Sequence, residues 1–439
     1  MWRRPAPGRP DLESSHPFRF TKDGGSPRGL ASHNEHFMAY RPIPRYHAKM
    51  PDHKTPRYLV LTELFLPTKG GTAVWFDEVY RRLGDRTTHI LTAAVPGGAE
   101  HDRDHPNTIH RLNLARHPWL RPSSLPAYLR LFLRGLRLGL THRFDAVHAG
   151  RVLPEGLVAW LVARLIRCPV VIYAHGEEIT TWSRSPRRRR AMRFAYRHAD
   201  CVIANSEFTR DQLRNLGADP KRIAIIHPGV DLDRFHPRYE IADLRQSIGL
   251  KEGQKLILSV GRLSRRKGFD KVIAALPTLL ESGIDVRYAI VGIGEDWDYL
   301  RQQAEQCGIA ERVHLLGHVD PADLPRWYCA ADLFAMPNRE INGDTEGFGM
   351  VFVEAAACGT PSVAGQAGGT AGAVLDGVTG LRIDGANANE VTQALRRMLK
   401  NPEFLADLGA SGERRARTEF SWEAVAERTQ ALNLTSQPL

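Results

Sequence analysis

Short apolar runs alternate along the chain with longer stretches of helical period, beginning at Arg57. A first series of runs lies at 58–64, 89–94, 146–149, 169–175, 201–205 and 223–227. A second series follows at 255–260, 287–292, 313–317, 333–337 and 361–364. Strands that alternate with helices indicate βαβ units and a mainly parallel, doubly wound sheet. The pattern therefore predicts an α/β chain with two Rossmann-like domains in tandem.

The two series are separated by 228–246, a segment rich in Asp, Arg and Pro that shows no regular period. We expect an N-terminal domain over 50–236 and a C-terminal domain over 237–420. Ligands of such sheets bind at the carboxyl ends of the strands. If the two domains face each other, the site is expected in the cleft between them.

The composition of the 439 residues, 42% hydrophobic and 25% charged, fits a soluble globular protein. It excludes collagen-like, mucin-like and wholly disordered classes. The formal net charge is +11, but residues 1–49 alone carry nine Lys/Arg against four Asp/Glu, together with seven prolines. We expect 1–49 to be a disordered basic tail, with Met50 as an alternative translation start. The rest of the chain is only mildly basic.

Cysteine usage and hydropathy indicate the compartment. Five widely spaced cysteines without a C-x-x-C pair argue against a disulfide framework or a structural zinc site. The N-terminus lacks the apolar segment of a secretory signal. The most apolar stretch, 156–174, is interrupted by Arg164, Arg167 and Pro169, so it predicts no membrane span. We expect a cytoplasmic protein with free thiols.

Two loops that follow the first strand of each domain suit an anionic ligand. Glycines in Lys69-Gly70-Gly71-Thr72 permit positive φ and let backbone N–H groups approach an anion. An ordinary strand–helix turn has the same composition. In 259–268, Arg262 and Lys267 stand five residues apart. Arg can grip a phosphate bidentately and Lys adds a point charge; a solvated basic loop is the alternative.

Two glutamates eight residues apart, Glu346 and Glu354, flank a glycine-containing loop and an apolar run. Gly347 and Gly349 suit a loop whose N–H groups face a ligand, and the run from Met350 suits a buried helix. Glu346 would then lie at the mouth of the loop, with Glu354 about two turns into the helix. Such acids suit sugar hydroxyls better than phosphate, although acids are also favoured at helix starts by the dipole.

Other polar motifs carry less information. His175, at the end of a predicted strand, could bond a hydroxyl or a developing charge, or be structural. Two D-x-D pairs, 231–233 and 296–298, are interpreted as structural. The G-x-G at 292–294 is followed by Trp297 where a dinucleotide fingerprint needs its third glycine, so no NAD site is predicted.

Taken together and in this order, these residues resemble the family 4 glycosyltransferases of the GT-B fold, over about 57–430. The E-x7-E element is the most specific part of the resemblance. It is accompanied by Gly261-Arg262, Lys267-Gly268, His175-Gly176, Pro228–Asp231, 355–361 and Gly368-Gly369. The family pattern Gly-Gly-x-Pro-Glu is Gly-Gly-Thr-Ala-Gly at 368–372, so its acid is missing. The long polar loop 338–345 resembles the phosphatidylinositol mannosyltransferase-like subset, which favours GDP-mannose.

The resemblance implies retaining transfer of a hexosyl group from a nucleotide-sugar to a lipid-linked or polysaccharide-precursor acceptor, with no cofactor and no metal. It implies that His175 and Glu346 act at the reacting centre. It implies that the donor is bound by Gly71, Arg262, Lys267, Val319, Gly347, Phe348, Gly349, Met350 and Glu354. Among these, Arg262 and Lys267 would hold the diphosphate, Gly71 the distal phosphate, Glu354 the ribose and Val319 the base. A C-terminal helix at about 421–439 would complete the N-terminal, acceptor-binding domain.

Arginines concentrate in the predicted acceptor domain. Segment 125–140 places Arg130, Arg134 and Arg137 beside a row of leucines, and 184–197 holds seven Arg. Such surfaces can attract anionic lipid headgroups, which would place the enzyme peripherally on the inner face of the cell membrane. A helix packed on the sheet and a solvated arginine face are the alternative. Trp75 and Phe76 suit either an acceptor contact or core packing.

Three other functions remain open from the sequence. The same chemistry could use a UDP-sugar donor and a soluble acceptor. A basic nucleic-acid-binding protein without catalysis would explain the arginines, but it needs neither both glutamates nor the Arg262 and Lys267 grip. A phosphorylase using pyridoxal phosphate shares the fold, and the absorbance of the purified protein would reveal that cofactor. We expect a glycosyltransferase with no nucleic-acid partner.

Overall fold

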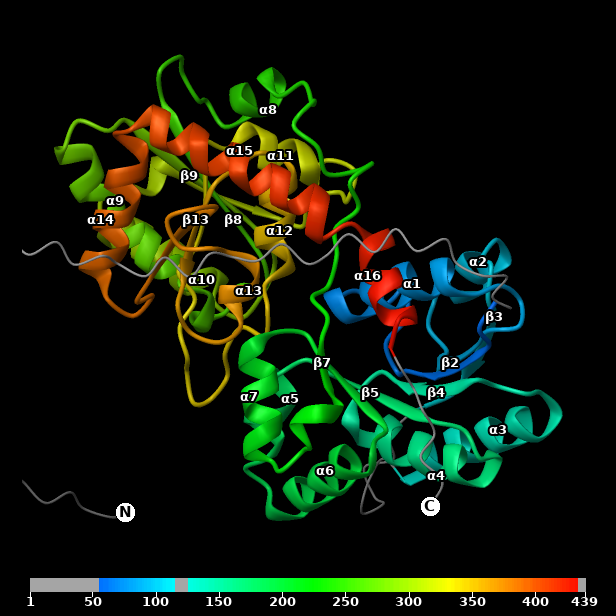
Figure 1. The fold of residues 1–439 in the computed structure, drawn as a ribbon. Coiled ribbons are helices and arrows are strands. Elements are labelled where there is room, and N and C mark those ends of the chain that lie inside the picture. The colour runs from blue at the N-terminus through cyan, green and yellow to red at the C-terminus, as the bar shows by residue number, and fades with distance from the viewer. Residues whose placement is uncertain (1–54, 115–124, 433–439) are drawn as a thin grey trace, which may run out of the picture. The chain divides into compact units, whose positions relative to one another are not determined.

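The computed structural model describes residues 55–114 and 125–432. The expected tail at 1–49 and the last part of the expected C-terminal helix lie outside these residues. The described residues belong to one compact unit and build two α/β lobes. Figure 1 shows the N-terminal lobe in blue to green and the C-terminal lobe in green to orange.

The N-terminal lobe contains a seven-stranded sheet in the order β3-β2-β1-β4-β5-β6-β7, with every pairing parallel. Its strands are β1 (Tyr58–Leu61), β2 (His89–Ala93), β3 (Thr108–Leu112), β4 (Ala146–Ala149), β5 (Val170–Ala174), β6 (Cys201–Ala204) and β7 (Ile223–Ile225). Its longer helices are α1 (Gly71–Leu83), α3 (Leu125–Thr141), α4 (Leu157–Ile166), α6 (Pro186–His198) and α7 (Glu207–Asn215). Shorter ones are α2 (Gly98–Arg103), η1 (Val152–Gly156), α5 (Glu177–Trp182) and η2 (Pro220–Arg222).

The C-terminal lobe contains a six-stranded sheet in the order β10-β9-β8-β11-β12-β13, again parallel. Its strands are β8 (Lys255–Val260), β9 (Val286–Val291), β10 (Val313–Gly317), β11 (Leu333–Met336), β12 (Ser362–Gly365) and β13 (Gly380–Ile383). Its helices are α8 (Ala242–Ser247), η3 (Arg265–Lys267), α9 (Phe269–Glu281), α10 (Trp297–Gln306), η4 (Ala310–Arg312), α11 (Leu324–Ala330), α12 (Met350–Ala357), α13 (Thr370–Ala373), α14 (Ala388–Leu399) and α15 (Pro402–Glu419).

The predicted α/β class and the two Rossmann-like sheets are confirmed, and each apolar run overlaps a strand. Two strands were missed, β3 and β13, and both lie at a sheet edge. The other two edge strands, β7 and β10, are also only partly buried, but they were predicted. Polar residues interrupt the apolar ones in β3 (TIHRL) and β13 (GLRI), so neither strand leaves an apolar run in the sequence.

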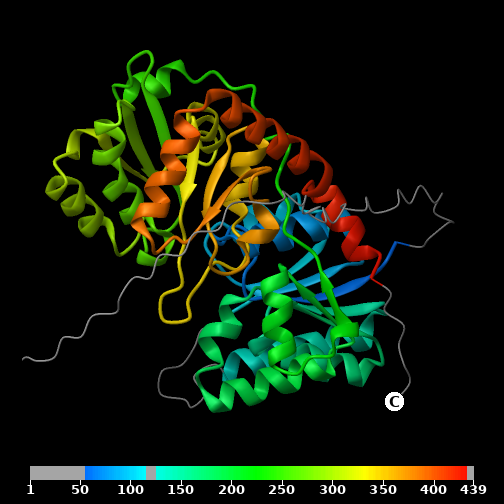
Figure 2. The same cartoon turned by 60° about the vertical axis from the view of Figure 1, so that its left-hand side comes forward.

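The last described helix, α16 (Trp422–Gln430), packs on α1 of the N-terminal lobe. Figures 1 and 2 show it, in red, beside the blue α1 after α15 has crossed the C-terminal lobe. Trp422 and Val425 are buried in one apolar cluster with Trp75 and Tyr80. The opposite face of the first sheet has its own cluster, beneath α3, α4 and α6. The chain therefore covers one face of its first sheet with its last helix.

Candidate functional site

A cavity of about 410 Å³ lies between the two lobes, next to the carboxyl ends of strands in both sheets. Nine of the eleven predicted site residues line it: Gly71, His175, Lys267, Glu346, Gly347, Phe348, Gly349, Met350 and Glu354. Arg262 and Val319 do not. The cavity thus brings together segments that are far apart in the sequence, since Gly71, Glu354 and Trp422 all line it.

Glu346 is held by two cations. Lys267 Nζ contacts Glu346 Oε2 directly, and an Arg266 guanidinium nitrogen lies 3.1 Å from the same oxygen. All three side chains are less than one-fifth exposed. Burial opposes ionisation of Glu346, but Lys267 and Arg266 outweigh it and hold its pKa below the usual value. The loop carboxylate is therefore charged and fixed in place.

Arg262 occupies a different environment from the predicted one. Its side chain is 74% exposed and pairs with Glu295 at 3.1 Å, while Arg266, which the sequence reasoning did not single out, faces the cavity. Arg266 also contacts Asp344 at 3.2 Å. The short helix η3 brings Arg266 and Lys267 together at Glu346, whereas Arg262 lies before this helix. The signal for Arg266 was its place directly before Lys267, but spacing alone gave no direction for its side chain.

The loop around Glu346 depends on close backbone approaches. A Cβ on Gly347 would lie 2.2 Å from His175 O, and Ser206 Oγ donates to Gly347 O at 2.8 Å, which joins the two lobes. Behind the loop, Gly369 N donates to Glu346 O at 2.8 Å. A Cβ on Gly368 would lie 2.1 Å from that same carbonyl oxygen. The glycine pair 368–369 therefore lets a second backbone support the Glu346 loop.

Glu354 is the fifth residue of α12, which begins only at Met350 after Gly349 takes a φ of 91°. The prediction of about two helical turns before Glu354 was therefore too long. The hydroxyl of Tyr328, on α11, donates to Glu354 Oε2 at 2.8 Å. Burial raises the pKa of Glu354, and the Tyr328 hydrogen bond partly opposes that rise. Tyr328 was not predicted, because the sequence around a buried aromatic residue carries no signal for a carboxylate partner.

His175 follows β5 and contributes a neutral ring to the cavity. Its Nε2 lies 2.8 Å from Gly150 O, and a carbonyl can only accept, so Nε2 carries the proton. Burial lowers the pKa of His175. The backbone N–H of His175 donates to Glu178 Oε1 at 2.8 Å. This fixed tautomer leaves Nδ1 as an acceptor.

The remaining candidates have structural contacts. Asp231 Oδ1 accepts the N–H groups of Asp233 and Arg234, as in an Asx turn, and Asp296 pairs with Arg265. Trp75 and Phe76 are both buried, and Trp75 also lines the cavity. Across the described ranges, no group of three or more His, Cys, Asp or Glu side chains could hold a metal ion.

Helix α3 exposes much of its apolar surface. Ala127, Leu131, Gly135 and Leu138 are buried along one side, while the side chains of Leu125, Leu129, Leu133 and Leu140 are between 52% and 74% exposed. No helix in the described part of the chain is both long and apolar enough to cross a bilayer.

Two family models match the chain. "Glycosyltransferase Family 4" covers residues 69–234 and "Glycosyl transferases group 1" covers residues 240–415. A GDP-mannose-dependent alpha-(1-6)-phosphatidylinositol monomannoside mannosyltransferase of Mycolicibacterium smegmatis is 33% identical over 84% of this chain and 96% of its own length. A D-inositol 3-phosphate glycosyltransferase of Thermobifida fusca is also 33% identical, over 82% of this chain and 87% of its own length.

Solved structures share the fold at lower identity. Anabaena HepE in complex with UDP superposes with a TM-score of 0.71 at 22% identity, covering 85% of this chain and 98% of HepE. Sucrose-phosphate synthase from Thermosynechococcus elongatus gives a TM-score of 0.70 at 23% identity, covering 85% of this chain and 97% of that one. Both likenesses span the two lobes together, not one sheet alone.

Proposed function

Because this chain belongs to the family 4 glycosyltransferases and has the GT-B fold, we propose that it transfers mannose, with retention, from GDP-mannose to a phosphatidylinositol-type glycolipid. Glycosyl transfer follows from the family. The donor, the acceptor and the stereochemistry are the proposal. The observation that carries the donor site is the cavity in which Lys267, Glu346 and Glu354 converge.

The cavity has complementary groups for each part of a nucleotide-sugar. Lys267 and Arg266 can meet the diphosphate, with the N–H of Gly71 at the N-terminus of α1 facing the distal phosphate. Glu346 and the N–H groups of 347–350 can bond the sugar hydroxyls, and Glu354 the ribose. Lys267 contacts Glu346 in this structure, so we infer that the donor diphosphate takes over part of that contact. For Arg262 to reach the diphosphate, its side chain would have to leave Glu295.

The reaction breaks the bond between the anomeric carbon and the diphosphate and forms a bond from that carbon to an acceptor hydroxyl oxygen on the same face. The acceptor proton passes to the leaving diphosphate. Negative charge grows on that group while the sugar gains oxocarbenium character. Preorganised cations and N–H dipoles in a cavity stabilise such charge, and losing one such group costs about 10²–10³ in rate. We infer that Lys267 and Arg266 fill this role without a metal, and that His175 Nδ1 accepts from a sugar hydroxyl.

The decisive experiment incubates the protein with a panel of nucleotide-sugars and a phosphatidylinositol mannoside acceptor, and measures nucleotide release and product linkage. We expect GDP-mannose to be used, with activity retained in EDTA. Glu346→Gln and Lys267→Ala should each reduce turnover about 10²–10³-fold. The exposed Glu340, in the loop before the site, supplies the matched control Glu340→Gln, which should keep full activity.

Other outcomes point elsewhere. Turnover of a UDP-sugar with a soluble acceptor would overturn the donor and acceptor assignment but keep the cavity as the active site. Full activity in both Glu346→Gln and Lys267→Ala would refute the cavity as the donor site. Inversion at the anomeric carbon of the product would refute retention.

We further propose that the enzyme works at the inner face of the cell membrane. Helix α3 lies on the same side of the first sheet as α4 and α6 (Figure 1). On α6, Arg187–Arg190 are all exposed. Exposed leucines and exposed arginines on one side of a lobe suit an anionic lipid surface. Binding to lipid vesicles tests this placement.

A further inference from the structure

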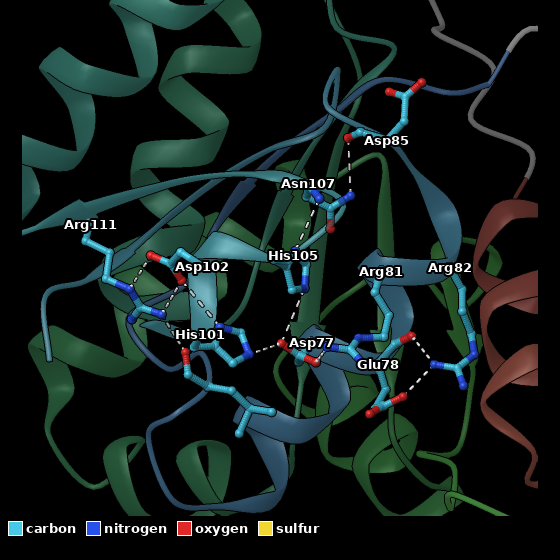
Figure 3. Close-up of polar contacts among 11 residues, drawn as sticks. Asp77, Glu78, Arg81, Arg82, Asp85, His101, Asp102, His105, Asn107 and Arg111 are labelled. Carbon is cyan, nitrogen blue, oxygen red and sulfur yellow. Dashed lines mark hydrogen bonds and ion pairs between the residues drawn. The ribbon is translucent and has the colours of Figure 1, made fainter. Parts of the chain in front are cut away.

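A polar network outside the cavity connects helix α2 and strand β3 to the segment that carries Gly71. Figure 3 shows its members between α1 and α2, with Asp77, His101, Asp102 and Arg111 in a row. None of these four side chains lines the cavity. Yet the network reaches the backbone of the loop between β1 and α1, and it also reaches α1 itself.

Arg111, on β3, fixes the loop. One of its terminal nitrogens donates to Leu66 O at 2.6 Å and the other to Ala93 O at 3.1 Å. The same guanidinium grips both oxygens of Asp102 at 2.8 Å. A Cβ on Gly98 would lie 2.6 Å from Arg111 Nε, so α2 begins with a glycine directly against the guanidinium. Burial opposes ionisation of Asp102, but its bonds to Arg111 and His101 lower its pKa.

Asp77 lies on α1 and connects that helix to the network. Its side chain is 1% exposed, and its oxygens lie 2.9 Å from His101 Nε2, 3.4 Å from His105 Nε2 and 2.9 Å from an Arg81 guanidinium nitrogen. The other ring nitrogen of His101, Nδ1, lies 3.3 Å from Asp102 Oδ1. His101 therefore joins the carboxylate that holds the helix to the carboxylate that holds Arg111.

The tautomer of His105 shows that this residue is not poised to ligate a metal. His105 Nδ1 accepts the N–H of Asn107 at 3.2 Å, so in the neutral ring the proton sits on Nε2, which faces Asp77. A nitrogen that carries a proton cannot ligate a metal. His101 on α2 and His105, two residues beyond the end of that helix, therefore both lie against the buried carboxylate of Asp77.

Gly71 lies between the two anchored points. Leu66 is five residues before it and Asp77 six residues after it. On the far side of the loop, Glu63 N donates to Glu155 Oε1 at 2.9 Å. Between these bonds the buried ring of Phe65 packs edge-on against His101 and His105, at 5.8 and 5.5 Å. A shift of this segment would disturb the Arg111 hydrogen bond to Leu66 O on one side or the contacts of Asp77 on the other.

We propose that Arg111 and Asp77, linked through Asp102 and His101, are positioning residues that set the N–H of Gly71 for the distal phosphate of the donor. This role rests on the donor site proposed above. It predicts that the network controls donor affinity although none of its members touches the donor. Acceptor affinity should not depend on it.

The test compares the variants Arg111→Lys and Asp102→Asn with the control Arg103→Lys. Arg103 is exposed and lies on α2, next to Asp102. Backbone hydrogen exchange across 62–76 is measured first, without any substrate. We expect exchange there to increase about tenfold or more in the first two variants, with the C-terminal lobe unchanged. Donor KM should rise about tenfold while acceptor KM stays constant, and Arg103→Lys should match the wild type.

A purely structural role predicts something else. General destabilisation lowers the folded fraction and hence kcat, but it leaves donor KM unchanged. Unchanged exchange across 62–76 in Arg111→Lys, or unaltered donor KM with reduced kcat, would overturn the proposal. If Arg111→Lys does not fold, Asp102→Asn decides alone, since it keeps the side-chain shape. If no donor is turned over by the wild type, the proposed function fails, while the exchange measurement still decides the positioning.

Discussion

The hydroxyl group of Tyr328 occupies one of the two carboxylate oxygens of Glu354. Tyr328 is fully buried, and its pKa is raised well above the usual value, chiefly by burial, so it keeps its proton and donates to Glu354 Oε2. In the donor site proposed above, the other oxygen, Oε1, would accept from the donor ribose. Burial raises the pKa of Glu354, and the Tyr328 hydrogen bond opposes that rise.

We expect Tyr328→Phe to weaken GDP binding about tenfold and to shift the acidic limb of binding to higher pH. Without the hydroxyl the pKa of Glu354 rises further, so protonation removes the ribose acceptor at a higher pH than in the wild type. A buried group left without its partner costs about 1–3 kcal/mol. Calorimetric titration with GDP from pH 5 to 8 measures both effects. Identical affinity and pH profile in the variant would contradict the role of Tyr328.

At the scale of single residues, the sequence identified positions that line the site, but not where their side chains point. Glu346, Glu354 and Lys267 were placed in one site because their loops follow parallel strands, and their roles there stay predictions. Arg262 and Arg266 could not be told apart, since only the folded loop shows that Arg266 lines the cavity while Arg262 pairs with Glu295. Tyr328 acts through a side-chain contact between two helices, and no spacing along the chain encodes that contact.

Strands β2 and β3 and helix α3 are joined by a cluster of histidines. His110 Nε2 lies 3.1 Å from His89 Nδ1, Arg134 donates to His110 Nδ1 at 3.0 Å, and the ring of His142 lies 4.4 Å from that of His89. Burial and neighbouring positive groups lower the pKa of His89 and of His110 to about 4. His89 and His110 are therefore neutral in the folded protein near pH 7.

We expect the free energy of unfolding to fall as the pH drops from about 6.5 to 4. In that window the unfolded chain binds protons at His89 and His110, whose unperturbed pKa is about 6.5, while the folded chain does not. Each unit of depression is worth at most about 1.4 kcal/mol per histidine. Urea unfolding at several pH values measures the slope.

His110→Gln supplies the check, because glutamine keeps an acceptor for Arg134 and cannot titrate. The variant should lose part of the pH dependence. The exposed His198 gives the control His198→Gln, which should retain it. Equal slopes in all three proteins would show that the cluster does not govern acid stability.

Individual elements were predictable where they are buried on both faces. The central strands appear as apolar runs for that reason, and β3 and β13 were missed because polar residues interrupt their short apolar sequences. The network of α2 was missed entirely, since its two histidines and Asp77 become neighbours only when α1 and α2 pack together.

At the scale of the whole molecule, the arginine-rich face of the N-terminal lobe should decide where the enzyme works. We expect the wild type to sediment with phosphatidylserine vesicles but not with neutral phosphatidylcholine vesicles. Replacing Leu129, Leu133 and Leu140 together by Gln should abolish most of this binding, because the variant loses three of the four exposed leucines of α3. Added salt should weaken the wild-type binding as well.

The matched control is Val378→Gln, which removes an apolar side chain that is 52% exposed in the C-terminal lobe. It should bind vesicles like the wild type. Transfer to a water-soluble acceptor analogue should be unchanged in the leucine variant, since α3 lies outside the cavity. Equal sedimentation of the leucine variant and the wild type would refute membrane placement through this face.

The arrangement of two lobes around one cavity followed from the sequence, because a doubly wound sheet places its loops at one edge and a second sheet supplies the facing wall. The contacts through which the two lobes meet could not be predicted from the sequence. The contact of Ser206 with Gly347 and the approach of Gly347 to His175 rest on backbone positions from distant loops, which a pattern of residue types does not specify.

The return of α16 to α1 sets an order of events during synthesis. The apolar pocket that Trp422 fills in the first lobe is complete in sequence once β7 has been made, yet Trp422 itself is made only after the whole C-terminal lobe. At about 5–20 residues per second, the first lobe waits roughly 10–40 s with this apolar pocket open. A nascent chain of this enzyme therefore presents a binding surface for chaperones that the finished protein no longer has.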